Sequence, residues 1–127
     1  MKVGLSLALG VGLSLLSSCS EPSGPIQGTL NVSLVTPNSD DGAVLFTVSG
    51  GPVDTIEAVG YPVYSARVDA NTLRIIVTGK LGSGPVARIR IADDRRLSHY
   101  TATINQVAVR ATYQQRDPSS YFLTLDH

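Results

Sequence analysis

The sequence predicts an all-β protein, an antiparallel β-sandwich of about eight or nine strands. Three observations lead to this prediction. From residue 29 onward, apolar and polar residues alternate with a period of two, as they do in strands with one buried face. Turn-forming residues interrupt the alternation at intervals of about 8 to 14 residues. No connection is long and periodic enough to be the crossover helix that a parallel sheet requires.

Seven short segments carry the alternation and are expected to be strands whose apolar residues face the core. In chain order they are residues 29–34, 44–48, 56–58, 64–68, 73–77, 87–91 and 121–125. The third segment is the weakest, and in the fourth Tyr64, Ala66 and Val68 are expected to point inward. A longer strand is expected over residues 100–112, where the alternation changes phase. A β-bulge at Asn105-Gln106 would reconcile the two phases.

The segments between these strands are rich in residues that favour turns and loops. They are residues 37–42, 49–52, 79–85, 92–98 and 114–120. None of them has the period of a helix, so the sequence predicts strands and loops alone after residue 28.

The composition limits the chain to one folded domain and excludes several classes of function. A chain of 127 residues has no room for a second hydrophobic core, which would need roughly 100 residues more. Ten basic and ten acidic side chains balance, whereas a nucleic-acid-binding domain usually carries a basic excess. One cysteine cannot form an internal disulfide, a thiolate zinc cluster or a CxxC redox pair.

The N-terminus has the pattern of an export signal. Met1 and Lys2 precede an uncharged apolar run over residues 3–16. As a helix this run would span about 21 Å, which is too short for a hydrocarbon core of about 30 Å. We therefore expect a helical secretory signal and not a membrane span.

The end of this signal resembles the lipobox of bacterial lipoproteins. The residues Leu16-Ser17-Ser18-Cys19 are an aliphatic residue, two small residues and a cysteine. The resemblance implies cleavage between Ser18 and Cys19 and a lipid on the Cys19 sulfur, which would anchor the mature chain to a membrane. Ser20 is not the aspartate that affects sorting in Gram-negative cells, so in a cell with two membranes the outer membrane is expected, with the domain facing the periplasm or the surface. The alternative is a plain secretory signal ending near Ser18, with a free thiol.

The resulting organisation is a signal peptide at residues 1–18, a flexible tether at residues 19–27 and a β-sandwich domain at residues 28–127. The tether contains prolines and glycines and almost nothing that could be buried. At about 3.3 Å per residue it would reach at most about 30 Å, which keeps the domain near the membrane.

A second resemblance concerns the domain. The segments GAVLFTVSG at 42–50, LRIIVTG at 73–79, GPVARIRI at 84–91 and YTATINQV at 100–107 occur in the order seen in cohesin-type modules, which are jelly-roll relatives of carbohydrate-binding sandwiches. The similarity covers about residues 28–125 and implies a cohesin-like sandwich. No residue identifies a dockerin contact, so the resemblance implies no dockerin partner.

The search for catalytic or metal-binding groups gives only isolated candidates. His99 and His127 have no second ligand at a metal-binding spacing, and Ser83 stands in an incomplete nucleophile motif. Asp40 and Asp41 could offer oxygen ligands to calcium, but an Asx-rich turn explains the same residues. We therefore expect no enzyme activity, no cofactor and no metal site.

The remaining candidate is a surface rich in arginine. Arg74, Arg88, Arg90 and Arg110 would form a binding face if all four projected from one sheet, and the alternative is a solubilising surface. Exposed aromatic rings are expected at Tyr61, Tyr113 and Phe122.

The function predicted from the sequence is a non-catalytic interaction domain of a cell-envelope lipoprotein. Such a domain would support protein–protein adhesion or assembly through the arginine face or an exposed edge strand. The alternative is a carbohydrate-binding module at the cell surface. The expected partners are therefore the membrane, through Cys19, and an envelope protein or a glycan, but no nucleic acid.

Overall fold

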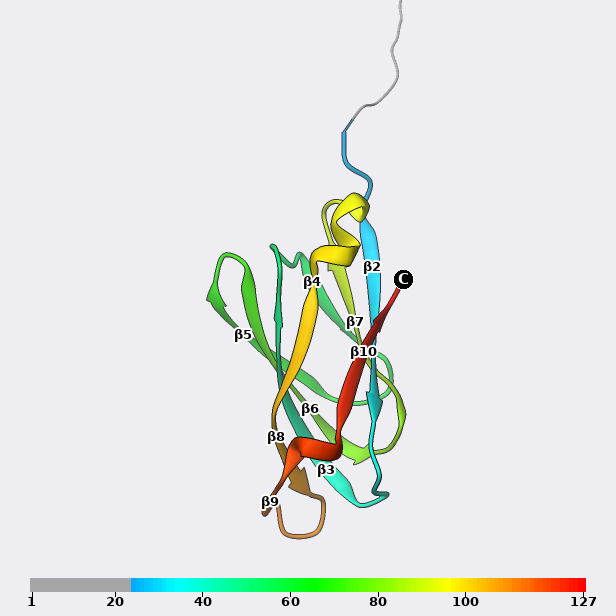
Figure 1. Cartoon of the computed structure of the whole chain (residues 1–127), viewed down its shortest axis with the longest axis vertical. Coiled ribbons are helices and arrows are strands. Elements are labelled where there is room, and N and C mark those ends of the chain that lie inside the picture. The colour runs from blue at the N-terminus through cyan, green and yellow to red at the C-terminus, as the bar shows by residue number, and fades with distance from the viewer. Residues whose placement is uncertain (1–23) are drawn as a thin grey trace, which may run out of the picture.

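The structure is a computed structural model that describes residues 24–127, and within them it confirms an antiparallel β-sandwich. One sheet has four strands, in the spatial order β10 (Phe122–Asp126), β2 (Gly28–Val35), β7 (Gly84–Ile91) and β4 (Thr55–Ala58). The other has five, in the order β5 (Val63–Asp69), β6 (Thr72–Leu81), β3 (Asp41–Ser49), β8 (Thr101–Val109) and β9 (Gln115–Arg116). The two sheets pack face to face (Figure 1).

The core lies between the sheets and is built from alternate residues of the long strands. Phe46, Ile75 and Ile89, from β3, β6 and β7, have no exposed surface, and Leu30 of β2 has only 1% exposed. Burial of a side chain of this size stabilises the fold by about 1.5 to 3 kcal/mol. The alternation in the sequence therefore identified the inward faces of these four strands correctly.

The predicted bulge in the long strand is confirmed. Along the β3–β8 pairing, Leu45 lies opposite Gln106 and Phe46 lies opposite Ile104, so Asn105 is an extra residue. The Asn105 side chain turns to the outer face, where the Thr47 hydroxyl donates a 2.7 Å hydrogen bond to Oδ1 of Asn105. The bulge lets Ile104 and Val107 both pack against the core although they are three residues apart.

The inward and outward faces of β5 were predicted the wrong way round. Tyr64 and Val68 are 62% and 53% exposed, whereas Val63 packs against the core. Directly paired residues share a face, and Tyr64 is paired with Ile76, an outward residue of β6. Because β5 is an edge strand with only one sheet neighbour, its sequence is weakly constrained and both phases contain apolar residues.

Three predicted loops contain more regular structure than expected. β6 extends to Leu81 and β7 begins at Gly84, so most of segment 79–85 is strand. The charged segment 92–98 is largely the 3₁₀ helix η2 (Asp94–His99), and segment 114–120 contains β9 and the 3₁₀ helix η3 (Pro118–Ser120). Each 3₁₀ helix is preceded by an aspartate whose side chain accepts a backbone N–H. An aspartate also favours a turn within a loop, so its presence in the sequence did not distinguish a short helix from a loop.

Residues 24–27 enter the sandwich at one end, where β2 begins. The backbone N–H of Asp94 in η2 donates a 2.7 Å hydrogen bond to the carbonyl of Ile26. Figure 1 shows that η2 lies at this end of the sandwich, whereas β9 and η3 lie at the opposite end. The outer faces of both sheets therefore extend away from the end at which residues 24–27 enter β2.

Candidate functional site

The structure divides the four predicted arginines between the two sheets, so they do not form the single face expected from the sequence. Arg88 and Arg90 lie on β7 in the four-stranded sheet. Arg74 lies on β6 in the five-stranded sheet, and Arg110 follows the last residue of β8. Alternation predicts whether a residue points in or out, but not which sheet its strand joins, and consecutive strands β6 and β7 join different sheets.

We call the outer face of the four-stranded sheet the polar face. Its two arginines, Arg88 and Arg90, form hydrogen bonds with other side chains of the same face. Arg90 Nε donates a 2.6 Å hydrogen bond to Glu57 Oε2, and Arg88 Nη1 lies 3.5 Å from Glu57 Oε1. Arg88 Nε also donates to Asn31 Oδ1 at 3.3 Å. The hydrogen bond from Arg90 is the main reason why the pKa of Glu57 is lowered. These guanidinium groups therefore have partners within the chain, and the surface around them resembles an ordinary solvated face.

The outer face of the five-stranded sheet carries an apolar row. Tyr64 of β5, Ile76 of β6, Leu45 of β3 and Gln106 of β8 lie side by side in register across four strands. We call the surface formed by Tyr64, Ile76, Leu45, Ala43, Ala108 and Tyr113 the apolar face. Two shallow hollows of about 240 Å³ each lie on it, and both are lined by Leu45 and Ile76.

Two exposed tyrosines stand at the sides of this face. Tyr64 lines one hollow and is 62% exposed, and Tyr113 lines the other and is 64% exposed. Tyr113 has a φ of 56°, the one non-glycine residue with positive φ in the described range. Its N–H donates a 2.7 Å hydrogen bond to the Val109 carbonyl, which fixes the turn after β8. A left-handed conformation costs a tyrosine about 1 kcal/mol or more, and such strain is concentrated at functional sites in proteins.

The predictions for exposed rings are partly confirmed. Tyr113 and Phe122 are exposed as expected. Tyr61 is not, because it packs against the core and lies beside Gly79, where a Cβ atom would come within 3.1 Å of the ring. Tyr64 was missed because its strand was given the opposite orientation.

Arg74 is the one predicted arginine that belongs to the apolar face. It is exposed, lines the hollow beside Tyr64, and is paired across the sheet with Ala66 and Thr47. In the described part of the chain, no side chain forms a salt bridge or hydrogen bond with it. The apolar surface on this sheet therefore has an uncompensated positive charge, that of Arg74, at its side.

The predicted Asp40-Asp41 turn is part of a hydrogen-bonded cluster that the sequence did not reveal. Arg116 of β9 donates to both carboxylate oxygens of Asp40, at 2.7 and 3.1 Å, and to Asp41 Oδ1 at 3.0 Å. The fully buried Asp41 also accepts 2.6 Å hydrogen bonds from the hydroxyls of Tyr121 and Thr36. The hydrogen bond from Arg116 is the main reason why the pKa of Asp40 is lowered. The cluster joins the start of β3 to β9 and to the residue before β10, so it links the two sheets.

This cluster accounts for the carboxylates that the sequence offered to calcium. Both are occupied by Arg116, and the remaining oxygen of Asp41 accepts from Thr36. Across residues 24–127, no three carboxylate, imidazole or thiol groups gather closely enough to hold a metal ion. Nothing in the sequence pairs Arg116 with Asp41, because a separation of 75 residues carries no local signal.

The other isolated candidates do not assemble into a catalytic group. His99 is exposed at the end of η2, and Asp93 is paired with Arg95 at 2.9 Å. Ser83 accepts a hydrogen bond from the Thr36 N–H and donates one to the Thr36 carbonyl, which ties two loops together. Cys19 and the signal sequence lie outside the described residues. Within those residues, none of the helical segments has the length and apolar character of a membrane span.

Comparison with known proteins finds no similar protein. No family model, no curated protein and no solved structure matches this chain.

Proposed function

We propose that this chain is a membrane-anchored interaction domain of the cell envelope, and that its apolar face binds another protein. The observation that carries the proposal is the row formed by exposed Tyr64 and half-buried Ile76 and Leu45 on one sheet. On the opposite sheet the arginines are paired with Glu57, and the exposed apolar side chains are the Val35–Phe122 pair at its edge. Interface centres are enriched in tyrosine and depleted in charge, and exposed apolar patches commonly mark interaction sites. This role requires no catalytic group.

The charge at the side of the face indicates what the partner carries. Arg74 has no acidic partner among the described residues, whereas Arg88 and Arg90 share Glu57. A guanidinium beside an apolar hollow is well suited to a carboxylate that flanks an apolar side chain. We therefore expect the partner to present an apolar residue to Leu45 and Ile76 and an acidic residue to Arg74.

The anchor in this proposal is the lipid expected on Cys19. The tether of residues 19–27 would hold the η2 end of the sandwich within about 30 Å of the bilayer. The apolar face would then extend away from the membrane and be open to a neighbouring envelope protein. The lipobox, the outer-membrane location and the cohesin-like resemblance support this arrangement as predictions from the sequence.

The binding proposal is tested by capture of envelope proteins on the full-length protein extracted from its own membranes. Leu45→Lys adds a charge to the centre of the apolar face, where the exposed end of the side chain can stay in water. Ser33→Lys makes the same addition on the polar face and serves as the matched control. We expect a protein that is retained by the wild type and by Ser33→Lys and is lost with Leu45→Lys. Equal retention by all three forms would overturn the proposal.

A glycan is the second candidate ligand, because Tyr64 and Tyr113 are exposed rings at the two sides of one face. Aromatic rings stack on the flat faces of sugars. If the protein in a nanodisc bound envelope polysaccharide, and if Tyr64→Ala and Tyr113→Ala each abolished that binding, the glycan would replace the protein partner in this account.

The anchor is tested separately by mass spectrometry of the membrane-extracted protein. The expected product begins at Cys19 and carries the added mass of acyl chains, and Cys19→Ala should leave the membrane fraction. An unmodified N-terminus would contradict the anchor without affecting the apolar face.

A further inference from the structure

The edge of the sandwich between β8 and β10 leaves two strands with unpaired backbone. β8 pairs with β3 along its length, but on its other side β9 covers only Val107 and Ala108. Residues 101–106 of β8 therefore have a sheet neighbour on one side only. β10 pairs with β2, and on its other side it lies close to β8 without pairing with it. Unpaired strand edges offer a row of N–H and C=O groups to another strand.

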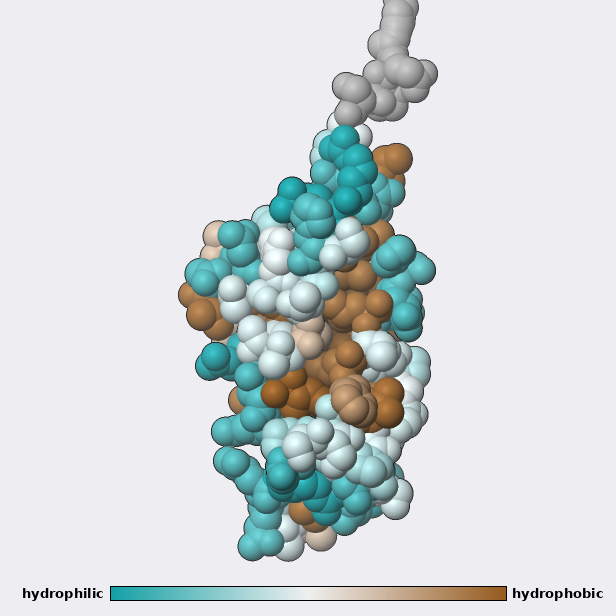
Figure 2. All heavy atoms as spheres, viewed as in Figure 1, coloured by the Kyte–Doolittle hydropathy of each residue, from teal (hydrophilic) through white to brown (hydrophobic). Residues whose placement is uncertain are grey.

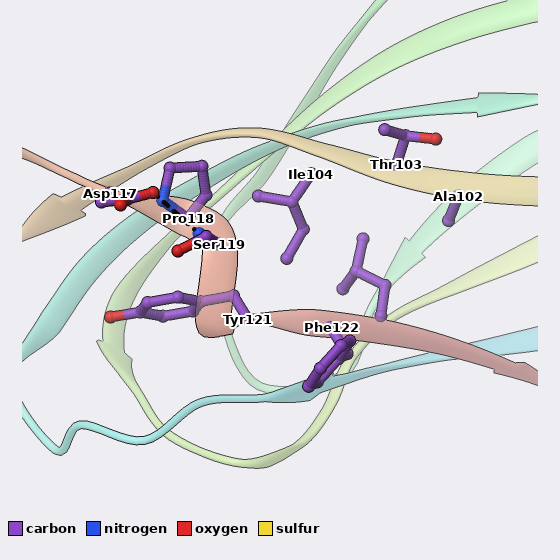
Figure 3. A pocket seen from close by; sticks show the side chains of 9 residues that line it. Ala102, Thr103, Ile104, Asp117, Pro118, Ser119, Tyr121 and Phe122 are labelled. Carbon is purple, nitrogen blue, oxygen red and sulfur yellow. Dashed lines mark hydrogen bonds between the residues drawn. The ribbon is translucent and has the colours of Figure 1, made fainter.

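A groove follows this open edge. Its volume is about 450 Å³, compared with about 240 Å³ for each hollow on the apolar face, and it is lined by residues 102–104, 117–119 and 121–123. Figure 3 shows Ile104 pointing from β8 into the space beside Tyr121. Figure 2 shows an apolar stripe along the same edge of the molecule. The stripe continues past the groove, because Leu125 is only partly buried against the core.

The groove has one charged group, and that group is acidic. Asp117 lines it, is exposed, and accepts a hydrogen bond only from the N–H of Ser119. No basic side chain of residues 24–127 forms a salt bridge with it. A ligand that matches this edge is therefore extended, apolar at every second residue and basic at the end that reaches Asp117.

We propose that the β8 edge and this groove bind an extended, basic–apolar segment of a partner protein, which adds to the five-stranded sheet as a strand beside residues 101–106. Hydrogen bonds to the free backbone of β8 would contribute affinity that does not depend on the sequence of the partner segment. The side chains of alternate residues would enter the groove against Ala102, Ile104 and Leu123 and give selectivity. This site is distinct from the apolar face and does not depend on it.

The test uses a synthetic nine-residue peptide in which valine alternates with threonine and both ends are lysine. Hydrogen exchange is measured by mass spectrometry on the full-length mature protein in lipid nanodiscs. We expect the peptide to slow exchange at residues 101–106 at least tenfold. A peptide of the same composition with its valines in one block should have no effect, because it cannot present a valine at every second position.

Matched variants locate the site. Ile104→Arg fills the groove and should abolish the protection, whereas Thr55→Arg, at an exposed position on β4 at the far edge of the four-stranded sheet, should leave it intact. Asp117→Asn keeps the cap on Ser119 but removes the charge and should weaken peptide binding about threefold, as expected for an exposed ion pair. Leu45→Lys should leave peptide binding unchanged, which separates this site from the apolar face. Unchanged exchange in the amides of β2 and β7 reports that each variant is folded.

Three results would overturn the proposal. The first is the absence of protection at residues 101–106 with saturating peptide. The second is equal protection of the free edge of β5 (Val63–Asp69), which has no such groove and would indicate non-specific strand pairing. The third is protection of residues 101–106 that rises with protein concentration without peptide, because the occupant would then be a second copy of this chain.

Discussion

The two outer faces of this sandwich are built from similar strands but leave different groups for a partner. On the four-stranded sheet, Arg88 and Arg90 meet at Glu57, and Asn31 accepts a further hydrogen bond. On the outer face of the five-stranded sheet, the neighbouring strands β3 and β6 present Leu45 and Ile76. The first face pairs its arginines within the chain and exposes Val35 and Phe122 only at one edge, whereas the second exposes a row of apolar side chains across its middle strands.

The difference indicates that charge content alone is a poor guide to a binding surface. Arginines that are hydrogen-bonded to a neighbouring carboxylate have fewer donors left for a ligand. Apolar side chains in water gain free energy when a partner covers them, at about 25 cal/mol per Å² of area removed from water. The face with fewer charges therefore has more to gain from binding.

The largest effect is expected on stability, from a substitution in the Asp41 cluster that links the two sheets. Asp41→Ala leaves Arg116, Tyr121 and Thr36 without their buried acceptor. We expect a loss of about 3 kcal/mol in the free energy of unfolding, measured by urea denaturation, because the hydroxyls of Tyr121 and Thr36 lose their acceptor. Arg116 keeps its two hydrogen bonds to Asp40. Asp126→Ala, at an exposed position on β10, is the control and should change little. A loss below about 1 kcal/mol for Asp41→Ala would mean that the cluster does not hold the sheets together.

A charge in the apolar row should act on binding with little effect on stability. With Ile76→Lys we expect at least tenfold less partner to be captured, equivalent to about 1.4 kcal/mol of binding free energy. Ile76 is only partly buried, so the unfolding midpoint should remain close to that of the wild type. The comparison fails if Thr124→Lys, on the polar face, reduces capture by the same factor.

Tyr113 should affect stability and binding in opposite directions. Asparagine tolerates the left-handed conformation better than tyrosine, so Tyr113→Asn should raise the free energy of unfolding by about 0.5 kcal/mol. The same change removes a ring from the side of the apolar face and should reduce capture of the partner severalfold. Calorimetry and the capture assay measure the two effects. If stability and binding both fell, the strain at Tyr113 would have no relation to function.

The smallest effect is expected on the polar face. Arg90 lowers the pKa of Glu57, so the ion pair stabilises the fold above the ordinary glutamate pKa of 4.5, and this contribution is lost as the pH falls through the lowered value. Glu57→Gln should therefore be slightly less stable than the wild type at pH 7, and the difference should shrink as the pH drops below 4.5. High salt should also reduce it. Urea midpoints of Glu57→Gln and the wild type across this pH range measure the difference, with Thr55→Ser as a control. A Glu57→Gln protein that is more stable than the wild type at pH 7 would contradict the prediction.

Much of the fold could be predicted from the sequence, because period-two alternation is a direct consequence of a strand with one buried face. The phase change in the strand 100–112 even located the bulge at Asn105. The alternation gave the wrong orientation for β5, because both phases of this strand contain apolar residues. Only the pairing of Tyr64 with Ile76 decides which side of the strand faces out.

The candidate sites were less predictable, because they depend on which strands become neighbours. Arg74 and Arg88 look equivalent in sequence but lie on different sheets. The row of Tyr64, Ile76 and Leu45 exists only through cross-strand register. The exposed part of β8 depends on how little of it β9 covers, which no local pattern encodes.

The central claim is that the apolar face, and not the polar face, contacts the partner. Photocrosslinking in intact cells tests it most directly, with benzoyl-phenylalanine in place of Tyr64 or Tyr113 on one side and in place of Thr124 on the other. We predict that Tyr64 and Tyr113 each crosslink to the same envelope protein and that Thr124 does not. Crosslinks from Thr124 alone, or equal crosslinks from all three positions, would contradict the account.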